Sequence, residues 1–549
     1  MALIVPGNIR LRNALASPPP AGATLASVVL FSSLSALLAM LYAGAEWYYA
    51  GGGFGFSSDL AWTRAVFARN LAAGSGLAFN PGAPTAGVAA PAWVGALAIG
   101  GFLTGSLFGA KLLGVICISL TAFLVWRVTL DLLGDWRFAF LASLLVAASP
   151  RLLAEALGGS EGALAALLLT AAIYWQAIGW AGTRKQRIAA VFAAALAALS
   201  RPELVLLLPL LALDRWLISL RQAERGRRLR QALSRSLPEL IGAGLVLAPY
   251  LLYNWRAGGP LWQQPEVALR AQPPLRWAVT ALSSLWASQP IVFCAALLGL
   301  PVAALAAARP TARHPSFLLV LAPLVVLLAP GLIWRFADSQ NAVISAAALA
   351  PIISVLGTAG LFLLYRALGR VLLRGRKRIS RLAYGAAIGL VVIALSTLTW
   401  FAHRQAWQRH GLAVRKVNDL QVYLGQWAAP HTAPDATIAT RDVGAIAYFS
   451  RRKMLDLGGR VDQFGLSYLR RPGSPDTNLL AVLQQTHPSY VAIRPSDFPD
   501  LSQRVDLLTP TVTCGFRDPI TGGVTTWVLY ETPWPAPSAR AARREASAR

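Results

Sequence analysis

Residues 24–46, TLASVVLFSSLSALLAMLYAGAE, lead into residues 57–82, SSDLAWTRAVFARNLAAGSGLAFNPG. The first stretch is apolar over about 20 residues, which is the length that an α-helix needs to cross a bilayer. Asp59 follows it, at the start of a segment rich in glycine, proline and aromatic residues. Ionisable groups close to lipid are costly to keep there. Asp59 is therefore the first candidate for a functional residue.

The composition predicts a polytopic membrane protein. Hydrophobic residues make up 56% of the 549 and charged residues only 13%, with a mean hydropathy of +0.52, whereas soluble domains carry about 25% charged residues. The net charge of +26 is concentrated in short gaps between apolar runs, near residues 184–187, 215–235, 309–313 and 366–381. This pattern marks cytoplasmic loops and suits contact with the lipid bilayer. Because no recognised module accompanies the charge, nucleic acid is not expected as a partner.

Apolar runs predict about eleven transmembrane helices. The positive-inside rule places the N-terminus in the cytoplasm and the C-terminus outside the cytoplasmic (inner) membrane. Residues 91–107, in the first outer loop of about 48–109, are expected as a helix that lies in the loop or dips into the bilayer, because counting them as a span would move the basic residues 184–187 outside. The first span is long enough for an uncleaved anchor. The expected spans are 24–46, 110–130, 138–150, 160–180, 188–200, 203–214, 237–254, 290–308, 316–334, 341–365 and 382–402.

Residues 188–214 are read as two short helices that turn at Pro202. A single helix would place Arg201 and Glu203 at mid-membrane, at a cost of about 2.5–3.5 kcal/mol each. Two helices put these charges at the surface and keep both flanking basic loops on one side. Proline also favours an extended residue before it, which suits a turn.

This layout gathers polar residues on the outer face, which predicts an active site at the membrane surface. The alternative is the ordinary polarity of loops. The residues concerned are Asp59, Arg151, Glu155, Glu161, Arg201, Glu203, Asn254, Arg256, Arg335, Asp338 and Asn341.

The chain is expected to divide near residue 405. Residues 1–404 form the transmembrane domain, and residues 405–533 form a small extracytoplasmic α/β domain, with a helix over 412–427 and strands over 436–440, 453–457, 489–494 and 524–530. The basic tail, 534–549, is expected to be disordered. The three cysteines allow no disulfide framework or zinc spacing.

Four sequence blocks, taken in order, resemble the GT-C fold glycosyltransferases, in particular bacterial mannosyl- and arabinosyltransferase-like members. The first is the loop from Asp59 through 68–71 (ARNL), 74–77 (GSGL), 79–82 (FNPG) and 91–93 (PAW). The others are 159–164 (GSEGAL), 199–203 (LSRPE) and 441–450 (RDVGAIAYFS). The resemblance covers most of residues 24–465.

The resemblance implies a hexosyl- or pentosyltransferase that uses a polyprenyl-phosphate sugar as donor. The acceptor would be a hydroxyl of a glycan, lipid or protein on the outer face. The first-loop aspartate of such enzymes is taken as the base or as a carboxylate that organises a metal ion, and Asp59 occupies that place. Related chains often carry two adjacent acidic residues, whereas here the second is Leu60. A divalent cation, Mg²⁺ or Mn²⁺ held by Asp59 and Glu161, therefore stays an open alternative.

An inverting displacement needs one base to deprotonate the incoming hydroxyl, and Asp59 suits that role. Its other interpretation is an N-cap of the helix that follows. The phosphate leaving group needs cations, for which the candidates are Arg201, Arg335 and Lys111; snorkelling to lipid head groups is the alternative.

Three further residues are candidates for substrate binding. Glu161 could bond sugar hydroxyls or orient an arginine, Asn80 lies in the first loop, and Glu203 could instead pair with Arg201. Asp442 is interpreted as a turn residue and left out of catalysis.

Two other function classes stay open, a transporter or flippase and a non-catalytic partner in envelope glycan assembly. Transporters often show repeated halves with sites at the bilayer midplane, whereas the charges here gather at one surface. The sequence has no Walker loop, no dinucleotide fingerprint in a βαβ context and no HExxH motif, so no nucleotide cofactor is expected.

Overall fold

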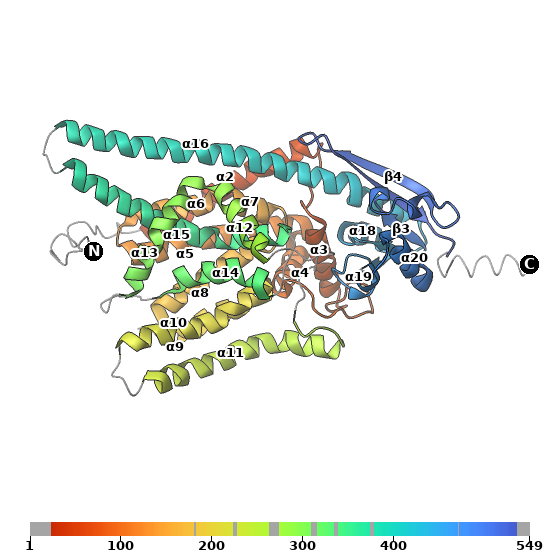
Figure 1. Cartoon of the computed structure of the whole chain (residues 1–549), viewed down its shortest axis with the longest axis horizontal. Helices are drawn as coiled ribbons and strands as arrows, with labels where there is room; N and C mark the ends of the chain where they lie inside the picture. Colours follow the sequence, from red (N-terminus) through yellow and green to blue (C-terminus); the bar gives the residue numbers. More distant parts are fainter. Residues whose placement is uncertain are drawn as a thin grey trace, which may run out of the picture.

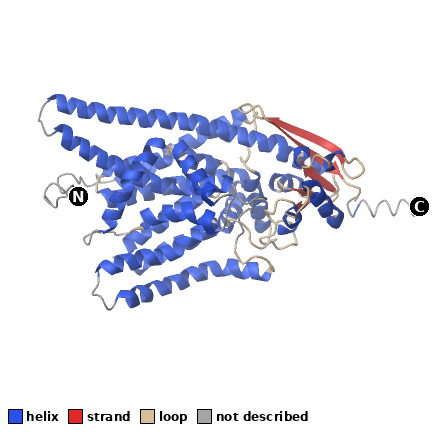
Figure 2. Ribbon diagram, in the orientation of Figure 1, coloured by secondary structure: helices blue, strands red, loops and turns tan. Residues whose placement is uncertain are grey.

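The structure, a computed structural model, describes residues 23–179, 183–222, 228–262, 274–308, 316–333, 339–373, 378–469, 471–534 and 538. A bundle of long helices occupies most of the molecule, and a small domain that contains the sheet lies at one end (Figures 1 and 2). The expected architecture, a helical membrane domain with a small C-terminal α/β domain, is confirmed at this level. The expected Arg335 and most of the 534–549 tail lie outside the described residues.

The bundle is built from helices of unequal length. They are α2 (Ala23–Tyr49), α5 (Ser106–Leu133), α6 (Trp136–Ala147), α7 (Pro150–Leu157), α8 (Gly162–Gly179), α9 (Arg184–Ser200), α10 (Leu207–Gln222), α11 (Arg228–Arg256), α12 (Pro274–Ser288), α13 (Pro290–Ala308), α14 (Leu318–Ile333), α15 (Ser339–Leu373) and α16 (Arg378–Val417).

Within the described ranges, four helical segments are long and apolar enough to cross a membrane, and the bent pair α6–α7 would make a fifth span. The four are Ala26–Tyr49, Ser106–Leu133, Pro290–Ala308 and Ala342–Arg370. The expected count of about eleven spans stays a prediction. Helix α12 was not among the expected spans; its 15 residues are fewer than the roughly 20 that a spanning helix needs.

The predicted break at Pro202 is present. Helix α9 ends at Ser200, Arg201 is extended with φ −146° and ψ 128°, and a short 3₁₀ helix, η1 (Pro202–Leu206), leads into α10. Helices α9 and α10 lie side by side in Figure 1. The extended residue before the proline is the conformation that the proline ring favours.

The first loop, residues 50–105 between α2 and α5, contains two helices. Helix α3 (Asp59–Ala72) starts at Ser58, whose hydroxyl accepts a hydrogen bond from the amide of Ala61 at 3.3 Å. Helix α4 (Pro91–Thr104) begins with a proline at its first position and ends at Gly105, which has φ 85°. The helix expected over 91–107 is present but ends at Thr104, and α3 and α4 pack against each other.

Helix α16 connects the bundle to the C-terminal domain without interruption. It passes the boundary expected near residue 405 and continues through a π-helical turn, η2 (Asn418–Val422), into α17 (Tyr423–His431). Figure 1 shows it running along one edge of the molecule to the domain. The helix expected over 412–427 is therefore part of one longer helical segment.

The C-terminal domain has a five-stranded sheet in the order β2-β1-β3-β5-β4. Strands β1, β2 and β3 pair in parallel, while β5 is antiparallel to both β3 and β4. The sequence predicted every strand except β4, which contains a proline and a glycine. The strands are β1 (Thr437–Thr440), β2 (Lys453–Asp456), β3 (Tyr490–Ile493), β4 (Thr509–Arg517) and β5 (Val524–Glu531).

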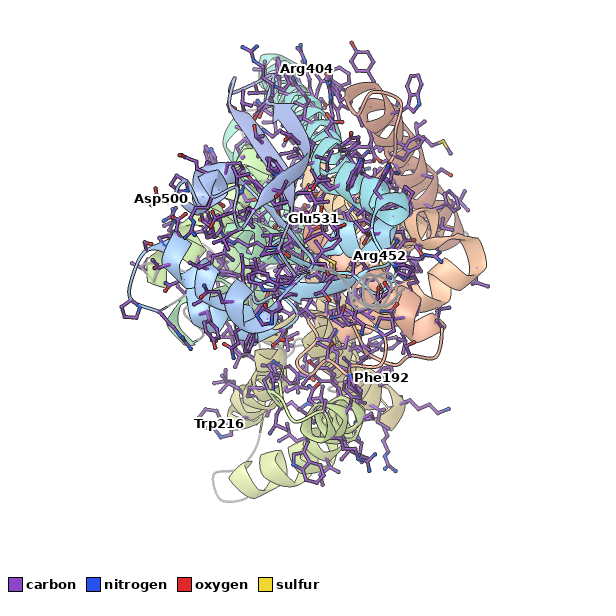
Figure 3. The ribbon with its side chains drawn as sticks, turned by 90° about the vertical axis from the view of Figure 1, so that its right-hand side faces the viewer. Phe192, Trp216, Arg404, Arg452, Asp500 and Glu531 are labelled. Atoms are coloured by element: carbon purple, nitrogen blue, oxygen red, sulfur yellow. The ribbon has the colours of Figure 1, made fainter. Side chains whose placement is uncertain are left out.

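The two faces of this sheet belong to two different cores. Val491 and Val528 face helix α20 (Pro475–Thr486) in a core that is local to the domain. Ala492 and Trp527 point the other way, into a core shared with the first loop. The alternation follows from the two-residue period of a strand, and it joins the domain to the bundle by apolar burial. Figure 3 views the molecule from this end, with Asp500 and Glu531 labelled on the domain and Phe192 and Trp216 labelled on α9 and α10 of the bundle.

Helix α18 (Gly444–Ser450) lies directly on α3 within the shared core. The approach is close at Gly444, where an added Cβ would overlap the carbonyl oxygen of Asp59 and come within 2.5 Å of the amide nitrogen of Thr63. Both neighbours are backbone atoms of a helix, so they have little freedom to move.

We therefore expect Gly444→Ala to loosen the domain from α3 and to lower the free energy of unfolding by about 1–3 kcal/mol, as overpacking of a core does. Thermal unfolding of the purified protein in detergent would measure this. Gly515→Ala is the matched control, since its added Cβ meets only the carbonyl of Thr525 at 3.9 Å. Equal melting temperatures for the two variants would contradict the close approach.

Candidate active site between the first loop and the C-terminal domain

The Asp59 carboxylate joins the first loop to the C-terminal domain. Its Oδ2 accepts a hydrogen bond from the amide of Gly444 at 2.9 Å, and its Oδ1 accepts one from the amide of Ala445 at 2.8 Å. These amides belong to the first turn of α18, where free N–H groups and the helix dipole favour an anion. The N-cap of α3 is Ser58. The interpretation of Asp59 as that N-cap is therefore wrong, since Asp59 binds the start of a different helix.

One arginine of the domain bridges two aspartates. Arg460 Nη1 lies 3.0 Å from Asp59 Oδ2, and Arg460 Nη2 lies 3.3 Å from Asp442 Oδ1. Asp442 Oδ2 also accepts a hydrogen bond from Gln421 at 3.0 Å. The turn residue that sequence reasoning left aside thus lies beside Asp59.

Burial raises the pKa of Asp59 to about 6, and the neighbouring negative charge of Asp442 acts in the same direction. Arg460 and the two α18 amides lower the pKa but do not offset those two effects. A general base works best when its pKa lies near the operating pH. The Asp59 carboxylate therefore suits proton transfer better than an ordinary surface aspartate would.

The loop that carries Arg460 is organised by a buried carboxylate. Asp456, at the end of β2, accepts hydrogen bonds from the amides of Gly458, Gly459, Val461 and Asp462 at 2.6–3.1 Å. Gly459 has φ 71°, which favours glycine. This turn fixes the backbone on both sides of Arg460 and directs its side chain at Asp59.

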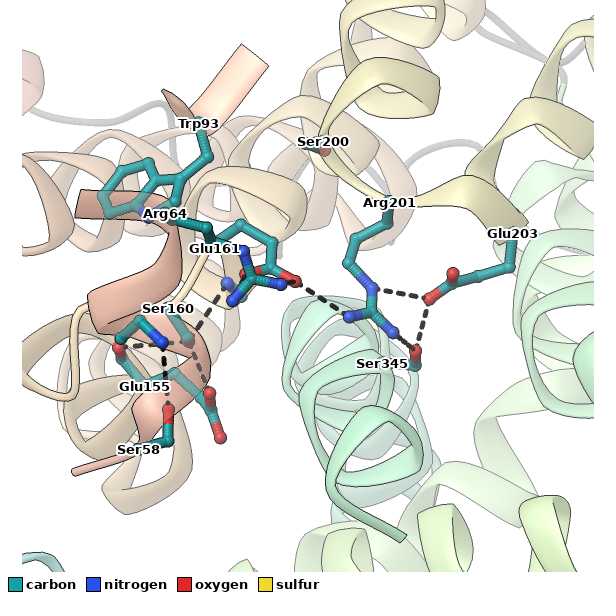
Figure 4. Close-up of polar contacts among 12 residues, drawn as sticks. Ser58, Arg64, Trp93, Glu155, Ser160, Glu161, Ser200, Arg201, Glu203 and Ser345 are labelled. Carbon is teal, nitrogen blue, oxygen red and sulfur yellow. Dashed lines mark hydrogen bonds and ion pairs between the residues drawn. The ribbon is translucent and has the colours of Figure 1, made fainter. Parts of the chain in front are cut away.

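A second polar network lies deeper, between α3 and the bundle (Figure 4). The Glu161 carboxylate is fully buried and contacts two guanidinium groups: Arg64 at 2.8 and 2.9 Å, and Arg201 Nη1 at 2.9 Å. Arg201 Nε reaches Glu203 at 2.9 Å, and Arg201 Nη2 donates to the Ser345 hydroxyl at 2.8 Å. Ser345 in turn donates to Glu203.

This network connects four segments that are distant in sequence. Arg64 lies on α3, Glu161 precedes α8, Arg201 and Glu203 flank the α9–η1 turn, and Ser345 lies on α15. Since charges are stable in a dry interior only when paired, the network fixes where α3 lies on the bundle. The expected pairing of Glu203 with Arg201 is present, and Glu161 contacts two arginines; its role in orienting an arginine for substrate stays a prediction.

The network bears on the expected phosphate contacts. The Arg201 side chain is 3% exposed and already contacts two carboxylates, so binding a lipid phosphate would require it to leave them. Lys111, on α5, contacts both oxygens of Glu46 at 2.6 and 2.7 Å. Glu46 also meets His410 at 2.8 Å and the amide of Gly55 at 3.0 Å. Arg201 and Lys111 therefore both hold helices together in this structure.

Asn80 lies against the edge of the C-terminal sheet. Its side-chain amide donates to the carbonyl of Met454 and accepts from the amide of Met454, both at 2.9 Å. These two hydrogen bonds resemble those that a neighbouring strand would make with β2. Asn80 thus contributes to the same contact between loop and domain as Asp59, and its role in binding substrate stays a prediction.

The residues present do not fit a divalent cation held by Asp59 and Glu161. Among the described residues, no group of three or more His, Cys, Asp or Glu side chains is placed to bind one. Asp59 accepts bonds from two amides and a guanidinium, and Glu161 is neutralised by two arginines. Mg²⁺ requires several free oxygen ligands in octahedral order.

Sequence reasoning missed several residues of these clusters: Glu46, Arg64, His410, Arg460 and Ser345. Glu46 and Arg64 carried a usable signal, because each is a charge close to an apolar span. Arg460 carried none, since it lies in a Gly-Gly turn that looks like an ordinary surface loop.

Comparison with known proteins concerns both parts of the chain. A family model described as a domain of unknown function (DUF8728) matches residues 410–537, and no curated protein matches the chain. The archaeal oligosaccharyltransferase AglB from Archaeoglobus fulgidus, in complex with an inhibitory peptide and a dolichol-phosphate, superposes with a TM-score of 0.58 at 13% identity. The match covers 94% of this chain and 75% of AglB.

ArnT from Cupriavidus metallidurans, bound to undecaprenyl phosphate, superposes with a TM-score of 0.56 at 15% identity, over 91% of this chain and 97% of ArnT. The chain has the GT-C fold. The mycobacterial arabinofuranosyltransferase AftD is also similar, with a TM-score of 0.50 at 16% identity, but the match covers 92% of this chain and only 40% of AftD. The resemblance inferred from the four sequence blocks is thereby confirmed for the fold.

The buried network makes a quantitative prediction for Glu161→Gln. The substitution removes the carboxylate that two buried guanidinium groups share, so we expect the free energy of unfolding to fall by about 3–5 kcal/mol. Denaturant unfolding in detergent would measure the loss. Asp419→Asn is the control, because its pair with Arg415 is exposed and such pairs contribute about 0–1 kcal/mol. Similar losses in the two variants would show that the network contributes little.

Proposed function

We propose that this protein is a membrane glycosyltransferase that moves a sugar from a polyprenyl-phosphate donor to a hydroxyl of a glycan, lipid or protein acceptor. The acceptor is used at the outer face of the cytoplasmic membrane. The GT-C fold over more than nine-tenths of the chain supports the reaction class, because solved neighbours with this fold are described with dolichol-phosphate or undecaprenyl phosphate bound. The observation that carries the proposal is the Asp59 carboxylate, buried between loop and domain with a raised pKa.

In the proposed step, the acceptor hydroxyl oxygen attacks the anomeric carbon of the donor sugar. A new carbon–oxygen bond forms while the bond from that carbon to the phosphate oxygen breaks. The polyprenyl phosphate leaves with the electron pair, and the hydroxyl proton passes to Asp59. One displacement inverts the anomeric configuration and needs no covalent intermediate.

The two oxygens of Asp59 differ in how many hydrogen bonds they accept. Its Oδ2 accepts from both Gly444 and Arg460, whereas Oδ1 has one described bond, from Ala445. A carboxylate oxygen can accept two hydrogen bonds, so in the proposed step the acceptor hydroxyl would bind Oδ1. Arg335 stays the predicted phosphate contact of the transmembrane part.

The decisive assay is the release of polyprenyl phosphate by purified protein in lipid. Polyprenyl-phosphate mannose, arabinose and glucose are supplied separately with a mixed envelope-glycan acceptor. We expect one donor to be used by the wild type, and Asp59→Asn to lose about 100-fold or more in rate, as loss of general-base catalysis does. Arg69→Ala is the matched control, since Arg69 also bridges α3 to α18, at 2.8 Å from the carbonyl oxygen of Tyr448, without touching Asp59.

Equal release by the wild type and Asp59→Asn would remove Asp59 from the mechanism. Loss of activity in both Asp59→Asn and Arg69→Ala would indicate that docking of the domain, and not proton transfer, had been disrupted. No release with any donor would contradict the proposal for these three sugars and direct the next measurement to flux across vesicles.

The pH dependence follows from the pKa of Asp59. The base acts in its ionised form, so kcat/KM should fall about tenfold per pH unit below pH 6 and level off above it. Asp442→Asn removes a charge that raises this pKa, so its profile should bend at a lower pH. Initial rates between pH 4.5 and 8, about the range in which such a base titrates, would test this. A bend unmoved by Asp442→Asn would assign it to another group.

A further inference from the structure

Asp59 and Asp442 come from different parts of the chain and face the same positive charge. The Arg460 guanidinium contacts Asp59 through Nη1 at 3.0 Å and Asp442 through Nη2 at 3.3 Å. The guanidinium therefore lies between two carboxylates, as a metal ion does in a site where two carboxylates bind it.

Each of the four oxygens in these two carboxylates already contacts a nitrogen donor. Asp59 uses the α18 amides and Arg460. Asp442 uses Arg460 for Oδ1 and Gln421 for Oδ2. A divalent cation would have to displace the guanidinium and compete with these donors, and Leu60 supplies no further carboxylate next to Asp59.

The guanidinium is also held in place before any substrate arrives. The turn around the Asp456 carboxylate fixes the Arg460 backbone. Gly458 leaves this turn no room for a side chain, because an added Cβ would lie 2.6 Å from the carbonyl oxygen of Arg441. A preorganised charge of this kind acts without reorganisation during a reaction.

We propose that Arg460 is the fixed cation of this site, in the place that a divalent metal ion would take between Asp59 and Asp442, and that sugar transfer proceeds without a divalent metal. The catalytic part of this inference rests on the proposed function, whereas the occupancy of the cation position does not. The Arg460 side chain is 18% exposed, which leaves an edge open to a phosphate. Guanidinium groups bind phosphate oxygens through paired N–H donors.

The occupancy is tested by Mn²⁺ titration followed by electron paramagnetic resonance, with the full-length protein in detergent and no substrate. We expect no Mn²⁺ bound between Asp59 and Asp442 in the wild type. Arg460→Ala, which removes the cation that the two carboxylates share, should bind about one ion per chain, and Arg460→Ala combined with Asp442→Asn should lose it. Arg504→Ala is the control, because it frees only the exposed Asp506 and should gain no site.

The result that overturns occupancy is a Mn²⁺ site in the wild type that Asp442→Asn abolishes, or no gain of a site in a folded Arg460→Ala. If Arg460→Ala does not fold, the wild-type and Asp442→Asn titrations decide alone. These readouts do not depend on activity, so they stand even if the proposed transferase reaction is not found.

The catalytic part is tested with the donor identified by the release assay. Treatment with EDTA should change the wild-type rate by less than about twofold, because no metal ion supplies the charge. Arg460→Ala should lower the rate about 100-fold or more, as loss of one preorganised electrostatic group does. A wild-type rate that EDTA abolishes and Mg²⁺ or Mn²⁺ restores would overturn metal independence while leaving the transferase function in place.

Discussion

Pairing of buried charge on the two sides of α3 is the constraint on which the rest of the structure depends. On one side, Asp59 binds the amides that open α18. On the other side, Arg64 binds Glu161 at the start of α8. An unpaired charge in either place would be left in a dry interior at high cost. The short helix is thus fixed both to the bundle and to the C-terminal domain, and the candidate base lies at the contact with the domain.

The two clusters of charged residues differ in their exposure to solvent. The inner network, centred on Glu161 and Arg201, is fully buried and sets the position of the first loop. The outer cluster of Asp59, Asp442 and Arg460 is partly open to solvent, since Asp442 and Arg460 are each about one-fifth exposed. The proposed reaction, with an incoming lipid and a hydroxyl acceptor, suits the outer cluster, while the inner one supplies rigidity to the loop that carries the proposed base.

Much of the fold could be predicted from local patterns. The apolar run of α2, the turn at Pro202 and four of the five strands follow from periodicity and from proline geometry. Strand β4 was missed because it contains a proline and a glycine, which strands disfavour, although Val512, Cys514 and Phe516 alternate with exposed residues. The expected boundary near residue 405 came from a change in composition, which does not register that one helix, α16, continues through it.

Part of the site could also be predicted from local sequence patterns. Asp59, Glu161 and Arg201 stand out as charges among apolar residues, so they could be found without a structure. Glu203, two residues from Arg201, was expected as its partner, but the distant partners could not be found, because Arg64 lies 97 residues from Glu161 and Arg460 lies 401 residues from Asp59. No local pattern specifies a contact between residues so far apart in sequence. The position of Arg201, bound to two carboxylates instead of exposed to a phosphate, depends on such a contact.

Because α16 is continuous, its length fixes how the C-terminal domain is rotated relative to the helical bundle. An α-helix turns about 100° and rises about 1.5 Å with each residue. One residue inserted between Trp400 and Val417 would swing the C-terminal domain by over a quarter of a turn, and α18 would no longer face α3. A seven-residue insertion would restore the angle but lift the domain by about 10 Å. The length of this helix is therefore as important for assembling the site as the residues that line it.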